Sequence, residues 1–530
     1  MEKTKIDYLI IGAGPAGIQL GYYFEKNKLD YCILERNDCS GSFFKTYPRH
    51  KKLISINKIY TGYDNPDLNM RWDWNSLLSD DTNMLLKNYS KEYFPHSDDF
   101  VKYLQDFADN FKLNIRYNCP VDAITKTEDG LFHVQCGTQH FESKRVIIAT
   151  GVPKQIVPDI EGIEHCEYYA DCSVDPEDYI DKKVLIIGKG NSGFEMADSL
   201  VATASRIHLV SPNNIKFAWK SHYVGNLRAV NNNLLDTYLL KSQNAILNAD
   251  IVKIEKQDNG KLKVTVDYTQ VRGGEKEEFE YDHVIITCGF KMDDAIFKGN
   301  AVPNTVYNGK FPELSNEWES TNVENLYFAG ILTHSRDFKK ATSGFIHGFR
   351  YNCEALAKIL MRKHEQKELH FNVLKGIDTA KLTEQIIEKI NLSSALWQQF
   401  SFMGDVLIVD KENNETRYCE ALPCDYIKEV LCKDEEEYYI ITLEYGSRHF
   451  DPFSEDVERI NRFDAEHADE SDFLHPVIRK YSKEKEVATI HLIENFHSEF
   501  DKPEHIKALK KFLDAEVLNG NAVKNNLVSY

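Results

Sequence analysis

Residues 8–21 read YLIIGAGPAGIQLG, and residues 184–197 read VLIIGKGNSGFEMA. Each stretch places an apolar run before three glycines spaced G-x-G-x-x-G, which is typical of a strand that turns sharply into a helix. The first glycine allows the tight turn, the second lets the backbone approach a pyrophosphate, and the third permits close packing of helix on strand. The sequence therefore predicts two dinucleotide-binding units in one chain.

The first glycine run is predicted to hold a flavin dinucleotide that stays bound. Glu35 ends the next predicted strand about 20 residues further on, where a carboxylate can accept a hydrogen bond from a ribose hydroxyl. A glycine at a strand end, as at Gly330, commonly marks close approach of the backbone to a ligand. The predicted FAD site comprises Gly12, Gly14, Pro15, Ala16, Gly17, Glu35, Arg36, Ser42, Phe43, Leu53, Val121, Thr150, Gly151 and Gly330.

The second glycine run differs from the first at the position that faces the ribose. Ser211 stands where the first copy has Glu35, so no carboxylate repels a 2′-phosphate there. Nearby lysines can supply a cation, which favours NADPH and leaves NADH open. The predicted nicotinamide site comprises Gly188, Lys189, Gly190, Asn191, Ser192, Gly193, Ser211 and Lys216. A degenerate repeat that binds nothing is the alternative.

Length and composition indicate a cored, enzyme-sized molecule. The chain has 530 residues, of which 42% are hydrophobic, and a formal net charge of -19. This charge argues against nucleic acid or an anionic membrane surface as a partner. The chain enters its first strand without an apolar leader, and no apolar run approaches the roughly 20 residues of a membrane helix. We therefore expect a cytoplasmic protein that binds no nucleic acid and no membrane, and a homodimer stays open.

The cysteines predict free thiols. All 11 are scattered along the chain, and no two form a C-x-x-C pair. We therefore expect neither a disulfide framework nor a metal site. A flavoprotein that passes electrons to a dithiol needs two adjacent thiols beside its ring, so the same pattern disfavours a dithiol reductase.

The order of predicted elements indicates an α/β chain with two dinucleotide-binding, Rossmann-like domains and an α+β C-terminal region. Apolar runs that end in ATG at 149–151 and in CG at 288–289 mark the places where the chain crosses between domains. We predict an FAD domain at 1–165 and 291–365, an NAD(P)H domain at 166–290, and a cap or interaction region at 366–530.

Several stretches resemble the landmarks of class B flavin-containing monooxygenases. They are LERNDCSGSFF at 34–44, KLISINKIYTG at 52–62, YFPHSDDFVKYLQDFA at 93–108, VIIATG at 146–151 and IIGKGNSGFEMA at 186–197. The resemblance implies FAD, NADPH and a C4a-(hydro)peroxyflavin, with Asn57 as the catalytic residue beside the flavin. An uncharged amide suits that role because it donates and accepts hydrogen bonds; a turn asparagine is the alternative. The histidine fingerprint of that family is incomplete, since Ala170 stands near the expected position.

A second resemblance extends over nearly the whole chain. GSFFKTYPRHKKLISINKIYTG at 41–62, HYVGNLRAVNNNLLDTYLLKS at 222–242, GFIHGFRY at 344–351 and FLHPVI at 473–478 are similar to the FAD-dependent oxidoreductase domain-containing type 2 family. Its members are flavoproteins of the endoplasmic reticulum associated with degradation. The resemblance implies that region 366–530 belongs to the enzyme as a unit. We do not carry over that location, because the expected targeting signals are missing.

These patterns together predict an FAD- and NAD(P)H-dependent monooxygenase that uses O2 to oxygenate nitrogen or sulfur in a small soluble substrate. Four polar residues in the family-like stretches are candidates for the substrate pocket, although such residues are commonly solvated or salt-bridged: Arg71, Asp73, His222 and Arg228. Two alternatives stay open. One is a flavin-dependent reductase or dehydrogenase that avoids oxygen, and the other is a flavin-bound protein-interaction module.

Overall fold

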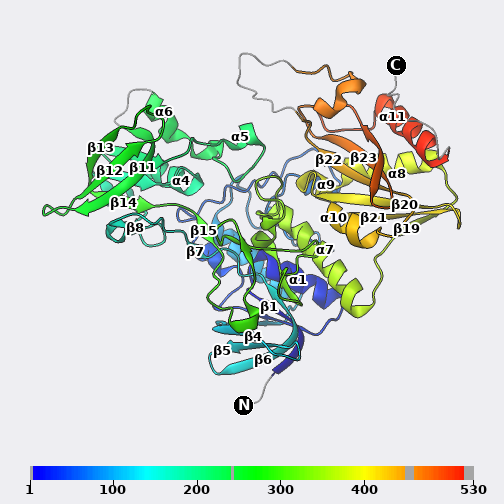
Figure 1. Cartoon of the computed structure of the whole chain (residues 1–530), viewed down its shortest axis with the longest axis horizontal. Coiled ribbons are helices and arrows are strands. Elements are labelled where there is room, and N and C mark those ends of the chain that lie inside the picture. Colours follow the sequence, from blue (N-terminus) through cyan, green and yellow to red (C-terminus); the bar gives the residue numbers. More distant parts are fainter. Residues whose placement is uncertain (1–3, 240–243, 448–458, 519–530) are drawn as a thin grey trace.

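A computed structural model describes residues 4–239, 244–447 and 459–518 and divides them into three lobes (Figure 1). Each lobe is built on its own large sheet, of seven, seven and six strands. The chain forms most of the first lobe, then the second, returns to complete the first, and ends in the third. The prediction of an α/β fold with an α+β C-terminal region is confirmed.

The first lobe carries the first glycine run at the carboxyl ends of parallel strands. Its strands are β1 (Thr4–Ile11), β2 (Tyr31–Leu34), β3 (Ile115–Arg116), β4 (Ala123–Lys126), β5 (Phe132–Cys136), β6 (Gln139–Ile148) and β18 (Leu326–Phe328). Their order is β3-β2-β1-β6-β5-β4, with β18 beside β6. β1 pairs in parallel with β2 and β6, so the turn that follows β1 lies at the edge of the sheet where the carboxyl ends of these strands meet. This edge is the usual position of a dinucleotide in such sheets.

Helices from distant parts of the sequence complete this lobe. They are α1 (Pro15–Lys26), α2 (Pro66–Asn69), α3 (Ser97–Asn110) and α7 (Ile346–Glu365), with the short turns η1 (Ser42–Lys45), η2 (Leu86–Asn88), η6 (Gly299–Ala301) and η7 (Gly330–Ser335) and the strand pair β16 (Thr305–Val306) and β17 (Phe311–Pro312). α1 begins at Pro15, where a missing N–H costs nothing. α3 turns the apolar residues Phe100, Leu104 and Phe107 inward, as their helical spacing predicts.

The second lobe repeats this plan around the second glycine run. Its elements are η3 (Ile163–His165), β8 (Glu167–Tyr168), η4 (Pro176–Tyr179), β9 (Lys183–Ile187), α4 (Asn191–Leu200), β10 (Arg206–Ser211), α5 (Ala218–Ser221), η5 (Ala229–Asn231), α6 (Asn233–Leu239), β11 (Ala245–Lys256), β12 (Leu262–Tyr268), β13 (Lys276–Tyr281) and β14 (His283–Ile286). β9 lies between β10 and β14 and pairs in parallel with both. The glycine run therefore again follows a central parallel strand.

The two crossings between these lobes pair with each other. β7 (Lys154–Gln155) leaves the first lobe, and β15 (Phe290–Lys291) returns to it, as the sequence predicts. The two segments form a two-stranded antiparallel sheet in which Phe290 lies opposite Gln155. Figure 1 shows this small sheet between the first and second lobes.

The third lobe is an antiparallel sheet covered on both faces. Its elements are β19 (Asn372–Lys375), α8 (Thr379–Leu392), α9 (Ser394–Gln398), β20 (Met403–Asp410), β21 (Glu415–Pro423), α10 (Cys424–Tyr426), η8 (Ile427–Leu431), β22 (Tyr438–Glu444), η9 (Ala465–Glu470), β23 (His475–Ser482), β24 (Lys485–His491), α11 (Pro503–Leu513) and η10 (Asp514–Leu518). Along β20, Leu407 packs with residues of α8 and α11, whereas Val406 and Ile408 share a core with residues of α7. Apolar residues at consecutive positions are typical of a strand buried on both faces.

The first and third lobes therefore share one hydrophobic core. α7 contacts α1 on one side and α9 and β21 on the other. The shared cluster joins Tyr8 and Ile10 of β1 to Leu356 of α7 and to Met403 and Tyr438 of the third lobe. Figure 1 shows α7 between the first and third lobes.

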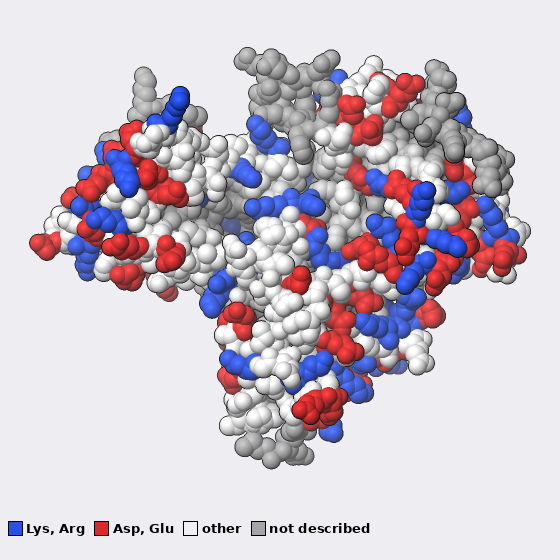
Figure 2. Space-filling model, viewed as in Figure 1, with Lys and Arg blue, Asp and Glu red and all other residues white. Residues whose placement is uncertain are grey.

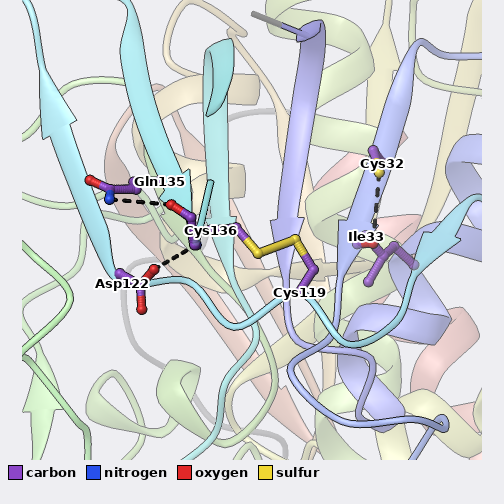
Figure 3. The surroundings of a disulfide bond; sticks show 7 residues. Cys32, Ile33, Cys119, Asp122, Gln135 and Cys136 are labelled. Carbon is purple, nitrogen blue, oxygen red and sulfur yellow. Dashed lines mark hydrogen bonds between the residues drawn. A yellow bond between two sulfur atoms is a disulfide. The ribbon is translucent and has the colours of Figure 1, made fainter. Parts of the chain in front are cut away.

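The prediction of free thiols is wrong for one pair of cysteines. Cys119 and Cys136 form a disulfide whose Cα atoms are 5.6 Å apart (Figure 3). Cys119 follows β3 and Cys136 ends β5, and the fold of the sheet brings these ends together in a way that sequence spacing does not reveal. Because disulfides are rare in reducing compartments such as the cytoplasm, this pair is an argument against the predicted cytoplasmic location.

Counting thiols tests this disulfide. The chain has 11 cysteines, and nine of them are free in the structure. We expect the denatured, unreduced protein to react with nine equivalents of a thiol reagent and the reduced protein to react with 11. Cys119→Ser combined with Cys136→Ser should leave nine under both conditions. Eleven reactive thiols before reduction would show that the pair is open and would fit a reducing compartment.

Within the described ranges, no helix is both long and apolar enough to cross a membrane.

Candidate functional site

The two glycine runs form the same local structure. Gly12 and Gly188 have φ values of +105° and +122°, a region that favours glycine. A Cβ on Gly12 or Gly188 would lie 2.8 or 2.7 Å from a carbonyl oxygen at the end of the neighbouring strand. A Cβ on Gly17 or Gly193 would lie 1.9 or 2.5 Å from the carbonyl oxygen of Gly12 or Gly188. The tight turn and the close packing of helix on strand are thus present in both copies.

Neither backbone torsions nor contacts within the protein require glycine at the middle position of each run. Gly14 (φ -76°, ψ -178°) and Gly190 (φ -98°, ψ -174°) have extended torsions that any residue adopts. A Cβ on either would meet no protein atom within 4 Å. Among the glycines that the structure describes, these two alone combine ordinary torsions with such open space. Because each lies at the N-terminus of a helix with free N–H groups, the residues fit a dinucleotide pyrophosphate in both lobes.

Glu35 lies where a ribose of the first dinucleotide is expected. Its carboxylate is buried and accepts hydrogen bonds from the N–H groups of Ala13 (2.9 Å) and Asn37 (3.0 Å). The hydroxyl of Ser42 donates to the same carboxylate over 3.2 Å. These contacts fix the orientation of the carboxylate beside the glycine turn, and its two oxygens retain acceptor capacity for a ligand. Glu35 and Ser42, both residues of the predicted FAD site, therefore lie side by side.

Thr150, Gly151 and Gly330 surround the same turn. The Oγ1 atom of Thr150 is buried without a hydrogen-bond partner, which is costly unless a bound group supplies one. Gly151 and Gly330 have φ values of +70° and +71°. A Cβ on Gly330 would lie 2.7 Å from the Cβ of Ala16, so β18 brings the chain directly against the start of α1. These residues fit a bound flavin dinucleotide.

Other residues of the predicted FAD site have different surroundings. Leu53 lies in the hydrophobic core with Leu77 and Phe100, so its side chain has a packing role. Arg36 and Phe43 are exposed. Val121 is partly buried and packs against the core on the other face of the first sheet. For Leu53, the structure replaces the predicted ligand contact with a contact between protein side chains.

The lysines predicted to bind a 2′-phosphate do not form a clamp. Lys189 donates from Nζ to the carbonyl oxygen of Leu247 (3.1 Å) and to the side chain of Asn248. Burial lowers the pKa of Lys189 to about 8, which weakens it as a permanent cation. Lys216 is exposed, and Ser211 donates to the carbonyl oxygen of Asn213 (3.3 Å). The predicted role of Lys189 is corrected: it ties the glycine turn to β11.

Asn191 links the second glycine run to a loop that reaches the first lobe. Its Nδ2 donates to the carbonyl oxygen of Asn226 (2.9 Å), and its Oδ1 accepts from the N–H of Arg228 (2.9 Å). These bonds hold residues 222–228 beside the start of α4. Ser192 lies next to Asn191 in the first turn of α4, where a nucleotide would approach.

Glu195 is a site residue that sequence reasoning missed. Its carboxylate accepts a hydrogen bond from the Tyr169 hydroxyl (3.0 Å), and burial raises its pKa to about 7. Tyr169 stacks on Tyr47 of the first lobe, with ring centroids 6.0 Å apart. The signal available in the sequence was a carboxylate two residues beyond Gly193, in the first turns of α4. Perturbed carboxylates of this kind concentrate at functional sites.

Asn57 is buried, and its amide hydrogens are used by the protein. Nδ2 donates to the carbonyl oxygens of Ser90 and Glu92, each over 3.1 Å. These bonds orient the side chain and leave Oδ1 as the atom available to a ligand. The amide can therefore accept a hydrogen bond there, whereas the predicted donor function is already taken.

Arg71 and Asp73 are engaged within the protein. Arg71 donates from Nη2 to the carbonyl oxygens of Ile390 (3.0 Å) and Asn391 (2.8 Å), at the C-terminal end of α8. Asp73 accepts from the N–H groups of Asn75 (3.0 Å) and Ser76 (2.8 Å). Arg71 therefore joins the first lobe to the third, and Asp73 holds a turn. These contacts correct the prediction that both side chains line a substrate pocket.

His222 and Arg228 form the boundary between the lobes. The ring of His222 stacks on Tyr445 of the third lobe, with centroids 4.1 Å apart. Arg228 donates to the carbonyl oxygen of Ile54 (3.0 Å) and lies over the ring of Trp74 at 5.2 Å. Sequence reasoning selected these two residues as substrate contacts, and the structure places them where the second lobe meets the other two.

A stack of rings continues this boundary inward. His347, at the start of α7, stacks on Trp74 (4.4 Å) and on Phe345 (5.7 Å), and Phe345 contacts Tyr223 (5.8 Å). His347 is 1% exposed, and both of its ring nitrogens are buried without a partner. Burial and nearby arginines hold its pKa well below the usual range, so the ring is neutral. An unpaired buried imidazole of this kind fits a ligand that offers a donor or an acceptor.

The charge distribution around this boundary differs from that of the whole chain. Although the net charge is -19, Figure 2 shows lysine and arginine side chains around the hollow between the second and third lobes. Acidic side chains lie mainly on the outer surfaces in this view. A locally basic opening attracts anionic ligands such as the phosphates of a dinucleotide.

Two lobes each carry a glycine turn and a helix N-terminus that fit a dinucleotide, and these two lobes meet at one boundary. This arrangement defines a pyridine-nucleotide oxidoreductase. Residues 9–330 match the family model described as pyridine nucleotide-disulphide oxidoreductase, and the chain belongs to this family. Over 96% of its length and 83% of the relative, the chain is 34% identical to FAD-dependent oxidoreductase domain-containing protein 2 of Mus musculus. This match confirms the whole-chain resemblance and includes the third lobe.

Solved structures support the same fold at low sequence identity. A flavin monooxygenase variant from Stenotrophomonas maltophilia is 16% identical with a TM-score of 0.52, over 68% of this chain and 99% of its own. The bacillithiol disulfide reductase Bdr (YpdA) from Bacillus cereus is 15% identical with a TM-score of 0.51, over 68% of this chain and 100% of its own. These likenesses concern the fold alone and confirm two Rossmann-like domains.

Proposed function

We propose that this chain is an FAD-dependent monooxygenase that takes hydride from NADPH or NADH. It uses O2 to oxygenate nitrogen, or sulfur, in a small soluble substrate. The observation that carries the proposal is the pair of open glycine positions, Gly14 and Gly190, on two lobes joined at one boundary. Two dinucleotide sites that meet in this way suit hydride transfer from a nicotinamide to a flavin.

The chain would bind and orient the cofactors and exclude water. FAD, when bound, supplies the redox chemistry and the activation of O2. The start of α1 would hold its pyrophosphate, Glu35 its ribose and Thr150 another polar group. Asn57 would present Oδ1, since its amide hydrogens are bonded to backbone carbonyls. The stacked rings of Trp74 and His347 would keep the boundary dry.

The cysteines support oxygen over a dithiol as the electron acceptor. Cys353 on α7 donates from Sγ to the carbonyl oxygen of Ala16 (3.7 Å), and burial raises its pKa to about 12. Cys288 lies near β9, and burial raises its pKa to about 11. Both thiols are protonated at neutral pH and are poor nucleophiles. The disulfide joins Cys119, which follows β3, to Cys136 at the end of β5, within the first lobe.

Rapid mixing of the NADPH-reduced holoprotein with oxygenated buffer tests the proposal. We expect a transient absorbance that belongs to neither oxidised nor reduced flavin, and one oxygen atom from ¹⁸O2 in an amine or thioether product. Asn57→Ala should shorten the transient at least about tenfold, the loss of one oriented polar group. Asn114→Ala is the matched control, because Asn114 also donates an amide hydrogen to a backbone carbonyl, that of Tyr31.

A flavin-dependent NAD(P)H reductase is the second candidate. It is favoured by the family description and by the fold shared with a disulfide reductase. Direct return to oxidised flavin, with stoichiometric hydrogen peroxide and no oxygenated product, would support it and contradict the monooxygenase. A separable interaction module is disfavoured by the core that the first and third lobes share. The rates at which equal concentrations of NADPH and NADH reduce the flavin identify the hydride donor. Ser211 supports NADPH, because it places no carboxylate where a 2′-phosphate would lie.

A further inference from the structure

Two buried side chains of the first lobe and a partly buried one of the second form a continuous line of hydrogen bonds. His334 and Asp337 are each 2% exposed, and Nδ1 of His334 lies 3.0 Å from Oδ1 of Asp337. Nε2 of His334 lies 3.0 Å from the hydroxyl of Tyr223, which belongs to the second lobe. The tyrosine and imidazole rings are nearly parallel, at 6° and 5.7 Å. The line therefore crosses the lobe boundary.

The direction of the hydrogen bonds follows from Asp337. A carboxylate only accepts, so Nδ1 of His334 donates to it and Nε2 is left as an acceptor. The Tyr223 hydroxyl then donates its proton to Nε2, which also accepts a longer hydrogen bond from the N–H of Lys339 over 3.5 Å. Asp337 is itself fixed, because its Oδ2 accepts from the N–H of Ser343 over 3.0 Å. Burial and the charge of Asp337 raise the pKa of Tyr223, so its hydroxyl passes a proton to Nε2 only when it receives another proton in exchange.

The line lies between the two glycine runs. His334 follows Gly330 on η7, and Gly330 is packed against the start of α1. Tyr223 belongs to the loop that Asn191 of the second run holds. The Tyr223 hydroxyl is therefore placed where the neighbours of the two dinucleotide sites meet.

Two other buried tyrosine–histidine pairs provide a comparison. Tyr281 and His208 lie 2.8 Å apart within the second lobe, and Tyr327 and His364 lie 2.9 Å apart in the first. Burial lowers the pKa of both His208 and His364 to about 4, so neither accepts a proton near neutrality. Among these described pairs, only that of His334 has a carboxylate bonded to the second ring nitrogen. A carboxylate in this position stabilises an imidazolium.

We propose that Tyr223, His334 and Asp337 form a proton relay that deprotonates an alkylammonium substrate; this inference rests on the proposed monooxygenase function. The ammonium proton passes to the Tyr223 oxygen while the Tyr223 proton passes to Nε2 of His334. The products are a neutral amine, a neutral tyrosine and an imidazolium held by Asp337. An aliphatic amine carries its proton at pH 7 and reacts at nitrogen only through the freed lone pair. A thioether has no such proton and does not need the relay.

Other charged groups lie near the relay. Lys310 lies over Phe311 and Phe338, which contact the His334 ring from β17 and from the loop after η7. Burial and the neighbouring Lys339 lower the pKa of Lys310. On the Tyr223 side, the same loop carries His222 and Arg228. Asp337 is the acidic group in direct contact with His334.

The test compares an amine with a thioether of similar shape. With benzylamine at pH 7, we expect Tyr223→Phe and His334→Gln to lower kcat/KM by roughly a hundredfold, the typical effect of losing a general base. With benzyl methyl sulfide, both variants should stay within about twofold of the wild type. The loss for benzylamine should fade as the pH approaches the pKa of the amine itself. Tyr327→Phe, which breaks the matched pair with His364, should change neither substrate.

A second measurement does not depend on turnover. In ¹⁵N-histidine NMR of the holoprotein, the His334 signals are those missing from His334→Gln, and we expect the proton on Nδ1. A proton on Nε2 would overturn the relay. Equal losses for both substrates, or no loss for benzylamine, would also overturn it and leave the monooxygenase intact. Absence of any oxygenated product from the wild type would instead overturn the proposed function, and the relay with it.

Discussion

Gly14→Ala is expected to leave the first lobe folded and to remove most of its bound flavin. The torsions of Gly14 suit alanine, and the added Cβ meets no protein atom within 4 Å. The methyl group would instead occupy the space at the start of α1 that a pyrophosphate needs. We expect FAD affinity to fall at least about a hundredfold, or ~2.7 kcal/mol. Flavin content after gel filtration and the circular dichroism spectrum measure binding and fold separately.

Gly190→Ala is the matched variant in the second lobe. Its torsions and surroundings repeat those of Gly14, so the fold should again persist. FAD should stay bound, while reduction by NADPH slows at subsaturating concentrations. Gly17→Ala separates steric from ligand effects, because its Cβ would lie 1.9 Å from the Gly12 carbonyl oxygen and should disrupt the turn itself. Full flavin content in Gly14→Ala would contradict the assignment of this turn to a pyrophosphate.

Arg350→Ala is expected to lower the free energy of unfolding by at least about 3 kcal/mol. Arg350 on α7 is 0% exposed, and its guanidinium donates to the carbonyl oxygens of Met70 (2.8 Å), Asp73 (2.9 Å) and Ser76 (2.8 Å). Truncation leaves these three acceptors buried and unpaired. Denaturant titration measures the loss, and hydrogen exchange of residues 70–76 should rise first.

Arg272→Ala controls for the loss of one arginine. Arg272 is exposed in the second lobe, and its removal should change the unfolding free energy by no more than about 0.5 kcal/mol. Arg350→Lys retains the charge without the planar fork, so an intermediate loss is expected. A loss for Arg350→Ala as small as that of the control would show that these bonds do not hold the segment.

Local patterns predicted the parts of this molecule that depend on neighbours in sequence. The turns at Gly12 and Gly188, and the position of Glu35, follow from a strand, a turn and a helix that are contiguous. Such patterns could not predict contacts between residues that are far apart in the sequence. The Arg71 acceptor on Ile390 is 319 residues away, and Tyr223 and His334 are 111 residues apart. The sequence therefore suggested that Arg71 lines a substrate pocket, whereas tertiary packing buries it against α8.

Tertiary contacts also explain why the predictions for the cysteines and for Lys189 were wrong. Cys119 and Cys136 meet because of how the first sheet folds, although no motif marks them. Lys189 has the spacing of a phosphate ligand, but β11 passes close enough to take its ammonium group. The function of a charged side chain depends on which backbone carbonyls the fold places within reach, and sequence spacing does not contain that information.

The apolar contacts of α7 limit how this protein could have acquired its third lobe. The two solved structures that share this fold are matched over 99% or more of their own length but over 68% of this chain, so the fold also occurs in shorter chains. In a chain of this fold without the third lobe, the side of α7 that here meets α9 and β21 would face water. A chain with the third lobe therefore needs apolar residues on that side of α7, where a chain without the lobe needs polar ones. The lobe and the helix face have to evolve together, and neither can be transferred alone.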